Sequence, residues 1–139
     1  MPVSARQSQL IRDSFAKLSD RLQPASMTFY EALFRRAPEL REMFRDDLAG
    51  QGMKFMTTLG IVIENIDQTE KLGDRFAELG RVHALIGVKA AHFEPMGEAL
   101  IDTLREELGE EEFDDEMEAA WRAAYAVLAE RVIRRGGIT

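Results

Sequence analysis

Hydrophobic residues recur at intervals of three and four along most of the chain, which is the spacing of one face of an α-helix. The pattern predicts helices from residue 4, over 24–36, 51–66 and 71–86, from 90 or 95 to 108, and over 114–135. Ser4 and Gln7 have the spacing of a capping box, and Gly87 and Gly109 mark helix ends. Neither an alternating run nor a hairpin signal occurs. The sequence therefore predicts an all-α fold of six to eight helices in one domain over residues 1–139.

Two stretches interrupt the helical pattern in its first half. Pro24 is predicted as the first residue of the second helix, because its missing N–H would be unpaired there. Pro38 is predicted to start a short turn that leads to Met43 and Phe44. Residues 45–52 are polar and contain glycine, so we expect a loop or frayed corner there.

Composition narrows the classes of function. The chain has no cysteine, which excludes disulfide scaffolds, thiolate metal sites and cysteine nucleophiles. Its formal net charge of −7 disfavours nucleic acid as a partner. The longest uncharged apolar-rich run, residues 55–63, is far shorter than the roughly 20 residues of a membrane span. The first residues lack the apolar core of a signal peptide, so we expect a cytoplasmic protein without a membrane partner.

One histidine occupies an apolar stripe of the helix predicted over 71–86. Leu72, Phe76, Leu79, His83 and Ile86 are spaced by four, three, four and three residues. A buried imidazole needs partners for both nitrogens, which leaves two interpretations. His83 is either a core residue bonded to a backbone carbonyl or a metal ligand. A single protein ligand in an apolar pocket holds a metal only when the metal is already caged in a macrocycle, as in haem.

Five stretches around this histidine favour the second interpretation together. They are residues 28–34, Pro38 with Phe44, Gln51 with Lys54 and Phe55, residues 83–88 with His92, Phe93 and Gly97, and Trp121 with Tyr125. In this order and spacing the chain resembles bacterial single-domain haemoglobins and the globin part of flavohaemoglobins. The resemblance extends from about Ser4 to Arg135.

The resemblance implies a haem b pocket with a role for each matching residue. His83 would be the proximal iron ligand, with its other ring nitrogen donating to a carbonyl near Leu79. Tyr30 and Gln51 would face the bound gas, although a core tyrosine and a solvated glutamine remain the alternatives. The residues implied to pack on haem are Phe44, Phe55, Leu79, Val82, Val88, Phe93 and Met96. Lys54, Arg81 and Lys89 are candidates for the haem propionates or are solvated surface charges.

One departure from the family bears on the chemistry. Flavohaemoglobins surround the proximal histidine with a tyrosine and a glutamate, and the matching positions here are Phe93 and Gly136. Neither side chain makes a hydrogen bond to an imidazole. The imidazole is therefore expected to be less anionic, which favours reversible gas binding over cleavage of an O–O bond.

The function implied is reversible binding of O2, and of NO and CO, by a monomer or homodimer. Dioxygenation of NO is a further activity that would need electrons from a separate reductase. A haem-free, globin-like interaction or sensor module is the alternative, in which His83 and Tyr30 are ordinary core residues.

Overall fold

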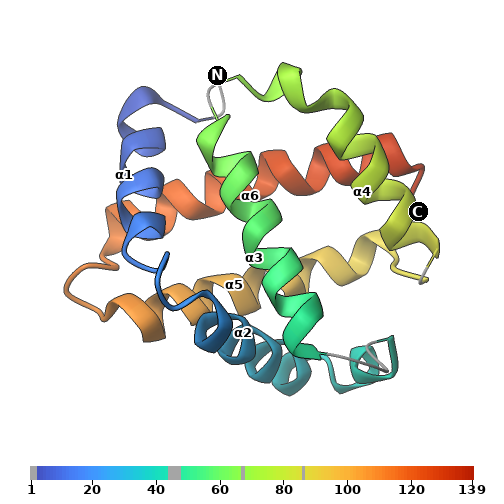
Figure 1. Ribbon diagram of the computed structural model, residues 1–139, viewed down its shortest axis with the longest axis horizontal. Coiled ribbons are helices and arrows are strands. Elements are labelled where there is room, and N and C mark those ends of the chain that lie inside the picture. The colour runs from blue at the N-terminus through green and yellow to red at the C-terminus, as the bar shows by residue number, and fades with distance from the viewer. Residues whose placement is uncertain (1–2, 44–47, 67, 86) are drawn as a thin grey trace.

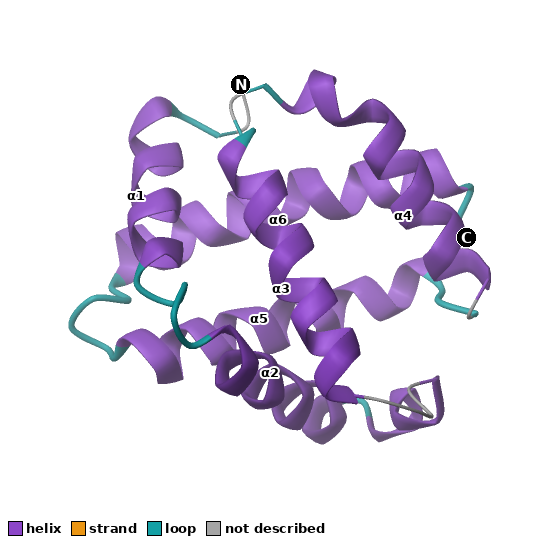
Figure 2. Cartoon of the chain, in the orientation of Figure 1, coloured by secondary structure: helices purple, strands orange, loops and turns teal. Residues whose placement is uncertain are grey.

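The computed structural model describes residues 3–43, 48–66, 68–85 and 87–139, and these residues form helices without strands (Figures 1 and 2). The α-helices are α1 Ala5–Ala16, α2 Leu22–Arg36, α3 Leu48–Glu64, α4 Gly73–Leu85, α5 Phe93–Leu108 and α6 Asp115–Gly136. Three short 3-10 helices connect them: η1 Pro38–Met43, η2 Thr69–Leu72 and η3 Ala90–His92. The all-α prediction is confirmed. Within the described ranges, no helix is long and apolar enough to cross a membrane.

Local capping interactions fix the first and last helices. The Ser4 hydroxyl accepts from the Gln7 N–H at 3.1 Å, and the Gln7 side chain accepts from the Ser4 N–H at 3.0 Å, so the predicted capping box is confirmed. The Asp114 carboxylate accepts from the Met117 N–H at 3.0 Å at the start of α6. Gly137 ends that helix with φ +62°, a left-handed conformation that favours glycine.

The structure corrects two boundaries. α3 begins at Leu48, so the loop prediction was wrong from that residue onward. Glycine lowers helix propensity, but Gly52 is needed for packing: an added Cβ would lie 2.5 Å from the Ser26 Oγ atom on α2. α2 begins at Leu22, two residues before Pro24, and the proline is tolerated because the first turn has unpaired N–H groups in any case. Phe44 lies outside the described residues.

The helices cross one another around two connected apolar clusters. α2 packs against α3 and α5, while α4 packs against α6, which runs behind α3 in the view of Figure 1. The larger cluster includes Trp121, whose indole N–H donates to the Ser14 hydroxyl at 2.9 Å. The smaller cluster lies around α4 and includes the buried side chains of Phe76, Val88 and Phe93. The half-buried side chains Met43 and Met96 contact both clusters. The smaller cluster thus packs along one face of the helix that carries His83.

Two glycines bring α4 and α6 into backbone contact. A Cβ added to Gly80 would lie 2.5 Å from the Cα atom of Gly136 and 2.7 Å from the Val132 carbonyl oxygen. Real Cβ contacts of this length do not occur, so the crossing requires glycine on both helices. Gly80 lies one turn before His83. The crossing therefore sets how closely the histidine-bearing helix packs on the core.

Candidate functional site

His83 lies in the last turns of α4 with a half-buried side chain. Its Nδ1 atom is 2.7 Å from the Leu79 carbonyl oxygen, which confirms the predicted hydrogen bond one turn earlier. A carbonyl oxygen only accepts, so Nδ1 carries the proton and donates. In a neutral imidazole the Nε2 atom then keeps its lone pair, which is the form that binds a metal.

An aromatic ring contacts the imidazole, and further apolar side chains form one cluster with that ring. The Phe93 ring centroid lies 5.8 Å from that of His83, with the planes tilted by 39°. Val88 and Phe93 are buried, and Leu79 and Met96 are half-buried against the same cluster. The Val88 N–H donates to the His83 carbonyl at 3.0 Å and so holds the chain that leaves α4. The imidazole thus stands at an apolar wall built by α4, α5 and the connection between them.

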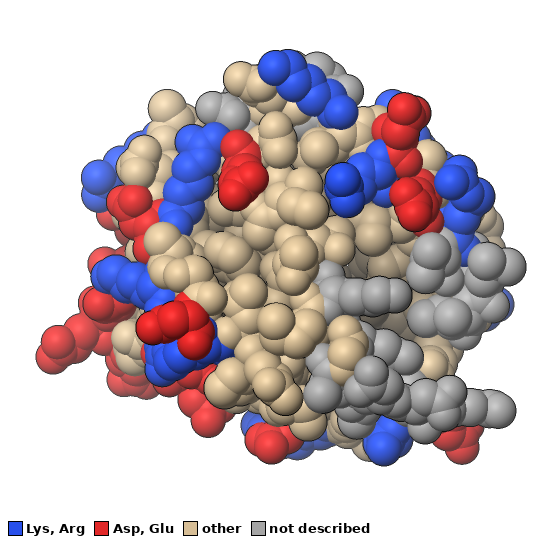
Figure 3. All heavy atoms as spheres, viewed as in Figure 1, with Lys and Arg blue, Asp and Glu red and all other residues tan. Residues whose placement is uncertain are grey.

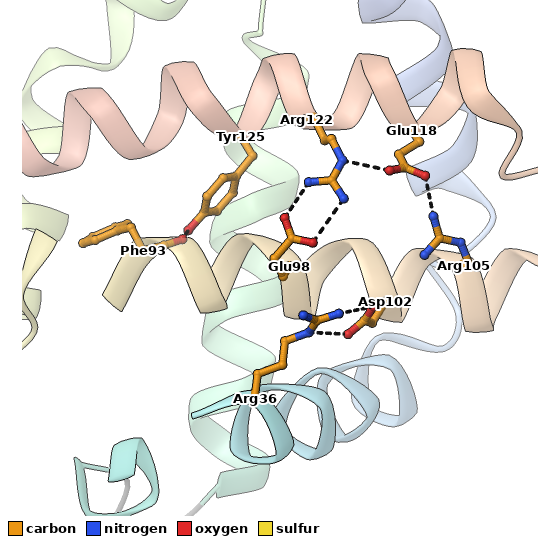
Figure 4. Close-up of polar contacts among 8 residues, drawn as sticks. All are labelled: Arg36, Phe93, Glu98, Asp102, Arg105, Glu118, Arg122 and Tyr125. Atoms are coloured by element: carbon orange, nitrogen blue, oxygen red, sulfur yellow. Dashed lines mark hydrogen bonds and ion pairs between the residues drawn. The ribbon is translucent and has the colours of Figure 1, made fainter. Parts of the chain in front are cut away.

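The start of α5 is fixed by a tyrosine from α6. The Tyr125 hydroxyl donates to the Phe93 carbonyl at 2.6 Å (Figure 4). Burial raises the pKa of the Tyr125 hydroxyl, so it stays protonated and keeps donating. This bond holds the backbone of Phe93, whose ring contacts His83. Tyr125 therefore supports the imidazole through Phe93.

A second aromatic group lies on α2 and α3. Tyr30 is only 3% exposed; its ring stacks on Phe34 at 5.7 Å and meets Phe29 edge-on at 5.6 Å. Phe55 of α3 stacks on Phe29 at 4.6 Å. Burial raises the pKa of the Tyr30 hydroxyl to about 12, so the hydroxyl remains a donor at neutral pH. The structure thus joins Tyr30 and Phe55 in one cluster through Phe29.

Some of the other predicted site residues are exposed, and others have side chains outside the described part of the structure. Arg81 and Lys89 are exposed, as a surface charge or a propionate partner at the edge of a pocket would be. Gln51, Lys54 and Val82 lie in helices but their side chains are outside the described part of the structure, as is all of Phe44. His92 accepts from the Lys89 N–H through Nδ1 at 2.9 Å, so its imidazole closes the turn before α5.

The sequence interpretation missed Phe29 and Phe34 as partners of Tyr30. The four-residue spacing of Tyr30 and Phe34 on one helix was a signal that could have shown this contact. The Tyr125 bond to Phe93 joins residues 32 apart, and no local pattern marks it.

The structure shows the surroundings of Phe93 and Gly136, the two positions that depart from the flavohaemoglobin pattern. Phe93 lies beside His83 and offers it an aromatic ring. The backbone of Gly136 touches Gly80, where an added Cβ would come within 2.5 Å of the neighbouring helix. A glutamate does not fit at Gly136 while α4 and α6 pack this way. The hydrogen bond observed at Nδ1 ends on the neutral carbonyl of Leu79.

The donor set fits haem. A protein that holds haem through histidine would supply one imidazole, a hydrogen bond to its second nitrogen, and apolar walls. His83 supplies the imidazole with this hydrogen bond, and Leu79, Val88 and Phe93 supply part of the walls. Among the described residues no group of three His, Asp or Glu side chains could hold a bare metal ion.

An ion-pair network braces α5 against α2 and α6 (Figure 4). Arg122 contacts Glu98 at 2.6 Å and Glu118 at 2.8 Å, and Glu118 also pairs with Arg105. A separate pair joins Arg36 of α2 to Asp102 of α5 at 2.7 Å. Hydrogen bonding from Arg122 lowers the pKa of both Glu98 and Glu118. On the face shown in Figure 3, charged side chains gather at the margins and uncharged ones cover the middle, over α3.

Comparison with known proteins shows the family to which the chain belongs. A globin family model matches residues 27–132. An anaerobic nitrite reductase of Gossypium hirsutum is 29% identical over 147 aligned residues, which cover 95% of this chain and 92% of the relative. A flavohemoprotein of Bordetella pertussis is 30% identical over 91% of this chain but only 32% of its own length. The chain therefore spans about a third of the flavohemoprotein it matches.

A solved structure agrees with these sequence relatives. The engineered carbene transferase RmaNOD of Rhodothermus marinus superposes with a TM-score of 0.85 and 28% identity, covering 97% of this chain and 94% of that one. The family match and these relatives define a haem protein of the gas-binding class. The chain belongs to the globin family and is homologous to the globin domains of flavohemoproteins.

Proposed function

We propose that residues 1–139 act as a single globin domain that holds haem b through His83 and binds O2 reversibly, with CO and NO as further ligands. The observation that carries the proposal is the 2.7 Å hydrogen bond from Nδ1 to the Leu79 carbonyl, which leaves Nε2 available as the ligand atom. Leu79, Val88, Phe93 and Met96 would pack on the same side of the haem as the imidazole.

When bound, haem supplies an iron atom that takes a diatomic gas and gives O2 partial negative charge. A hydrogen-bond donor in a dry pocket stabilises such charge. Tyr30 is buried among aromatic rings and stays protonated, so we assign this donor role to its hydroxyl. Gln51 is the proposed second donor, and Phe55 and Phe44 are proposed to keep water out. The proposed partners of the haem propionates are Lys54, Arg81 and Lys89. Val82 is proposed to pack on the haem face.

The surroundings of His83 support reversible binding. Its Nδ1 proton goes to a neutral carbonyl, and its neighbour Phe93 has no hydrogen-bonding group. An imidazole that donates to a neutral carbonyl gives less electron density to iron than one paired with a carboxylate. This favours release of intact O2 over cleavage of an O–O bond.

The test is to cycle the ferrous, purified protein between air and nitrogen while following its absorption spectrum. We expect the spectrum to return over many cycles, and peroxide to be consumed more slowly than by a flavohemoprotein globin domain under the same conditions. Oxidation within the first cycle, or peroxide consumption as fast as in that domain, would contradict the proposal. A folded, colourless protein that ignores added haem would favour the haem-free interaction or sensor module.

Dioxygenation of NO at the same site is a second proposed activity, favoured by the homology to flavohemoproteins. Conversion of NO and O2 to nitrate takes up one electron for each NO, so turnover would require an electron donor, and we propose a separate reductase in the cytoplasm. NO consumption should then continue beyond one equivalent only when a reductase or chemical reductant is present.

A further inference from the structure

A cavity of about 120 Å³ lies between α3, α4 and α6, and its described lining residues include none of those assigned to the haem. Leu59 and Ile63 of α3, Phe76 of α4 and Leu128 of α6 form apolar parts of its wall. Val3 also lines it, because the N-terminal end of the chain lies beside the C-terminal end of α3 (Figure 1). The cavity is therefore mainly apolar, and its wall shares Phe76 and Leu128 with the smaller cluster around α4.

One charged residue borders this cavity. Arg131 of α6 is half-buried, and its Nε atom is fully buried without a hydrogen-bond partner. Other arginines of the described chain, such as Arg36 and Arg122, pair with carboxylates. A buried N–H group without an acceptor costs free energy, and a guanidinium N–H makes a strong, charge-assisted hydrogen bond to a carboxylate. Within the described part of the chain, no carboxylate accepts a hydrogen bond from this Nε atom.

The cavity limits the size of an occupant. An apolar protein cavity of roughly 150 Å³ takes a molecule such as benzene, so this one suits an apolar body of about six carbon atoms. The guanidinium at its border selects a negatively charged end. We propose that this cavity binds a small monocarboxylic acid, with its apolar body among Leu59, Ile63 and Leu128 and its carboxylate on Arg131.

The experiment is a calorimetric titration of the protein as purified, saturated with CO where it holds haem so that the iron is blocked. Hexanoate is the probe, and 1-hexanol is its neutral counterpart. The variant is Arg131→Met, which keeps an apolar stem and removes the charge. The matched control is Arg134→Met on the same helix, where the guanidinium is exposed, pairs with Glu130 and lies outside the cavity.

We expect saturable hexanoate binding that Arg131→Met weakens about tenfold and Arg134→Met leaves unchanged, because only the first removes a charge-assisted hydrogen bond. Hexanol should bind equally to both variants. Methyl resonances of Ile63 and Leu128 should shift on binding. Arg131→Met should fold at least as stably as the unchanged protein, since it removes an unsatisfied buried donor.

Four results would overturn the proposal. They are no saturable binding of hexanoate, an equal loss of affinity in both arginine variants, shifts that avoid Ile63 and Leu128, and an Arg131→Met protein that does not fold. The second would indicate a general charge effect, and the fourth would show that Arg131 has a structural partner.

Discussion

At the scale of single residues, the direction of one hydrogen bond decides what His83 does. The Leu79 carbonyl takes the Nδ1 proton at 2.7 Å and so selects the tautomer with a free Nε2. Phe93 packs beside the ring, and the Tyr125 hydroxyl holds the Phe93 backbone at 2.6 Å. On α2, burial keeps the Tyr30 hydroxyl protonated by raising its pKa to about 12. In the proposed function, His83 is the iron ligand of the pocket and Tyr30 is its hydrogen-bond donor.

Replacing Tyr30 by phenylalanine tests the donor role. Tyr30→Phe keeps the ring that stacks on Phe34 and removes only the hydroxyl. We expect O2 to dissociate about tenfold faster or more, since a hydrogen bond to a partly charged group is lost. Stopped-flow measurement of O2 release gives the rate. CO release is the internal control, because bound CO carries little charge and its rate should change much less. Equal O2 rates in both proteins would place the Tyr30 hydroxyl outside the gas site.

At the scale of elements, the position of the histidine helix depends on how α4 crosses α6. The backbones touch at Gly80 and Gly136, one turn from His83. α5 is held by two ion pairs. Arg122 of α6 pairs with Glu98, and Arg36 of α2 pairs with Asp102. The helix that carries the ligand and the helix that carries Phe93 are therefore positioned by different interactions.

Gly80→Ala tests the crossing. The added methyl would lie 2.5 Å from the backbone of Gly136, so we expect a loss of about 2 kcal/mol or more in the free energy of unfolding. Urea denaturation measures it. Gly73→Ala is the matched control on the same helix, because its Cβ would meet only the end of the Arg135 side chain at 3.4 Å. It should be neutral or slightly stabilising, since alanine favours helix. Equal losses in both variants would argue against the close crossing.

Arg122→Met tests the ion-pair network through its pH dependence. The pKa values of Glu98 and Glu118 are lowered below 4.5 in the folded protein, so their pairing stabilises it above about pH 4.5 and is lost as the pH falls further. We expect the variant to lose about 1 kcal/mol at pH 7, a modest value because the pairs are partly exposed. The difference from the unchanged protein should shrink toward pH 3 in urea denaturation series. A difference independent of pH would mean that Arg122 acts by packing alone.

At the scale of the whole molecule, apolar periodicity was enough to predict an all-helical fold, and capping signals added the start of α1 and the end of α6. Tertiary contacts were not predictable in this way. Gly52 weakened the helix signal locally, whereas its role is to let α3 approach Ser26 on α2. Periodicity placed His83 in the apolar stripe, but only the structure shows that Nδ1 is the nitrogen that Leu79 holds. The Tyr125 bond to Phe93 depends on two helices meeting, which no local pattern records.

The central claim is that His83 binds haem iron through Nε2 and leaves the opposite side open to gas. The most direct measurement is the visible absorption spectrum of the reduced protein with and without CO, for the unchanged chain and for His83→Gly with and without added imidazole. We predict a strong haem band that CO shifts in the unchanged protein. In His83→Gly the band should be lost or altered, and imidazole should restore it. A His83→Gly spectrum identical to that of the unchanged protein, or a folded protein that takes up no haem, would contradict the claim.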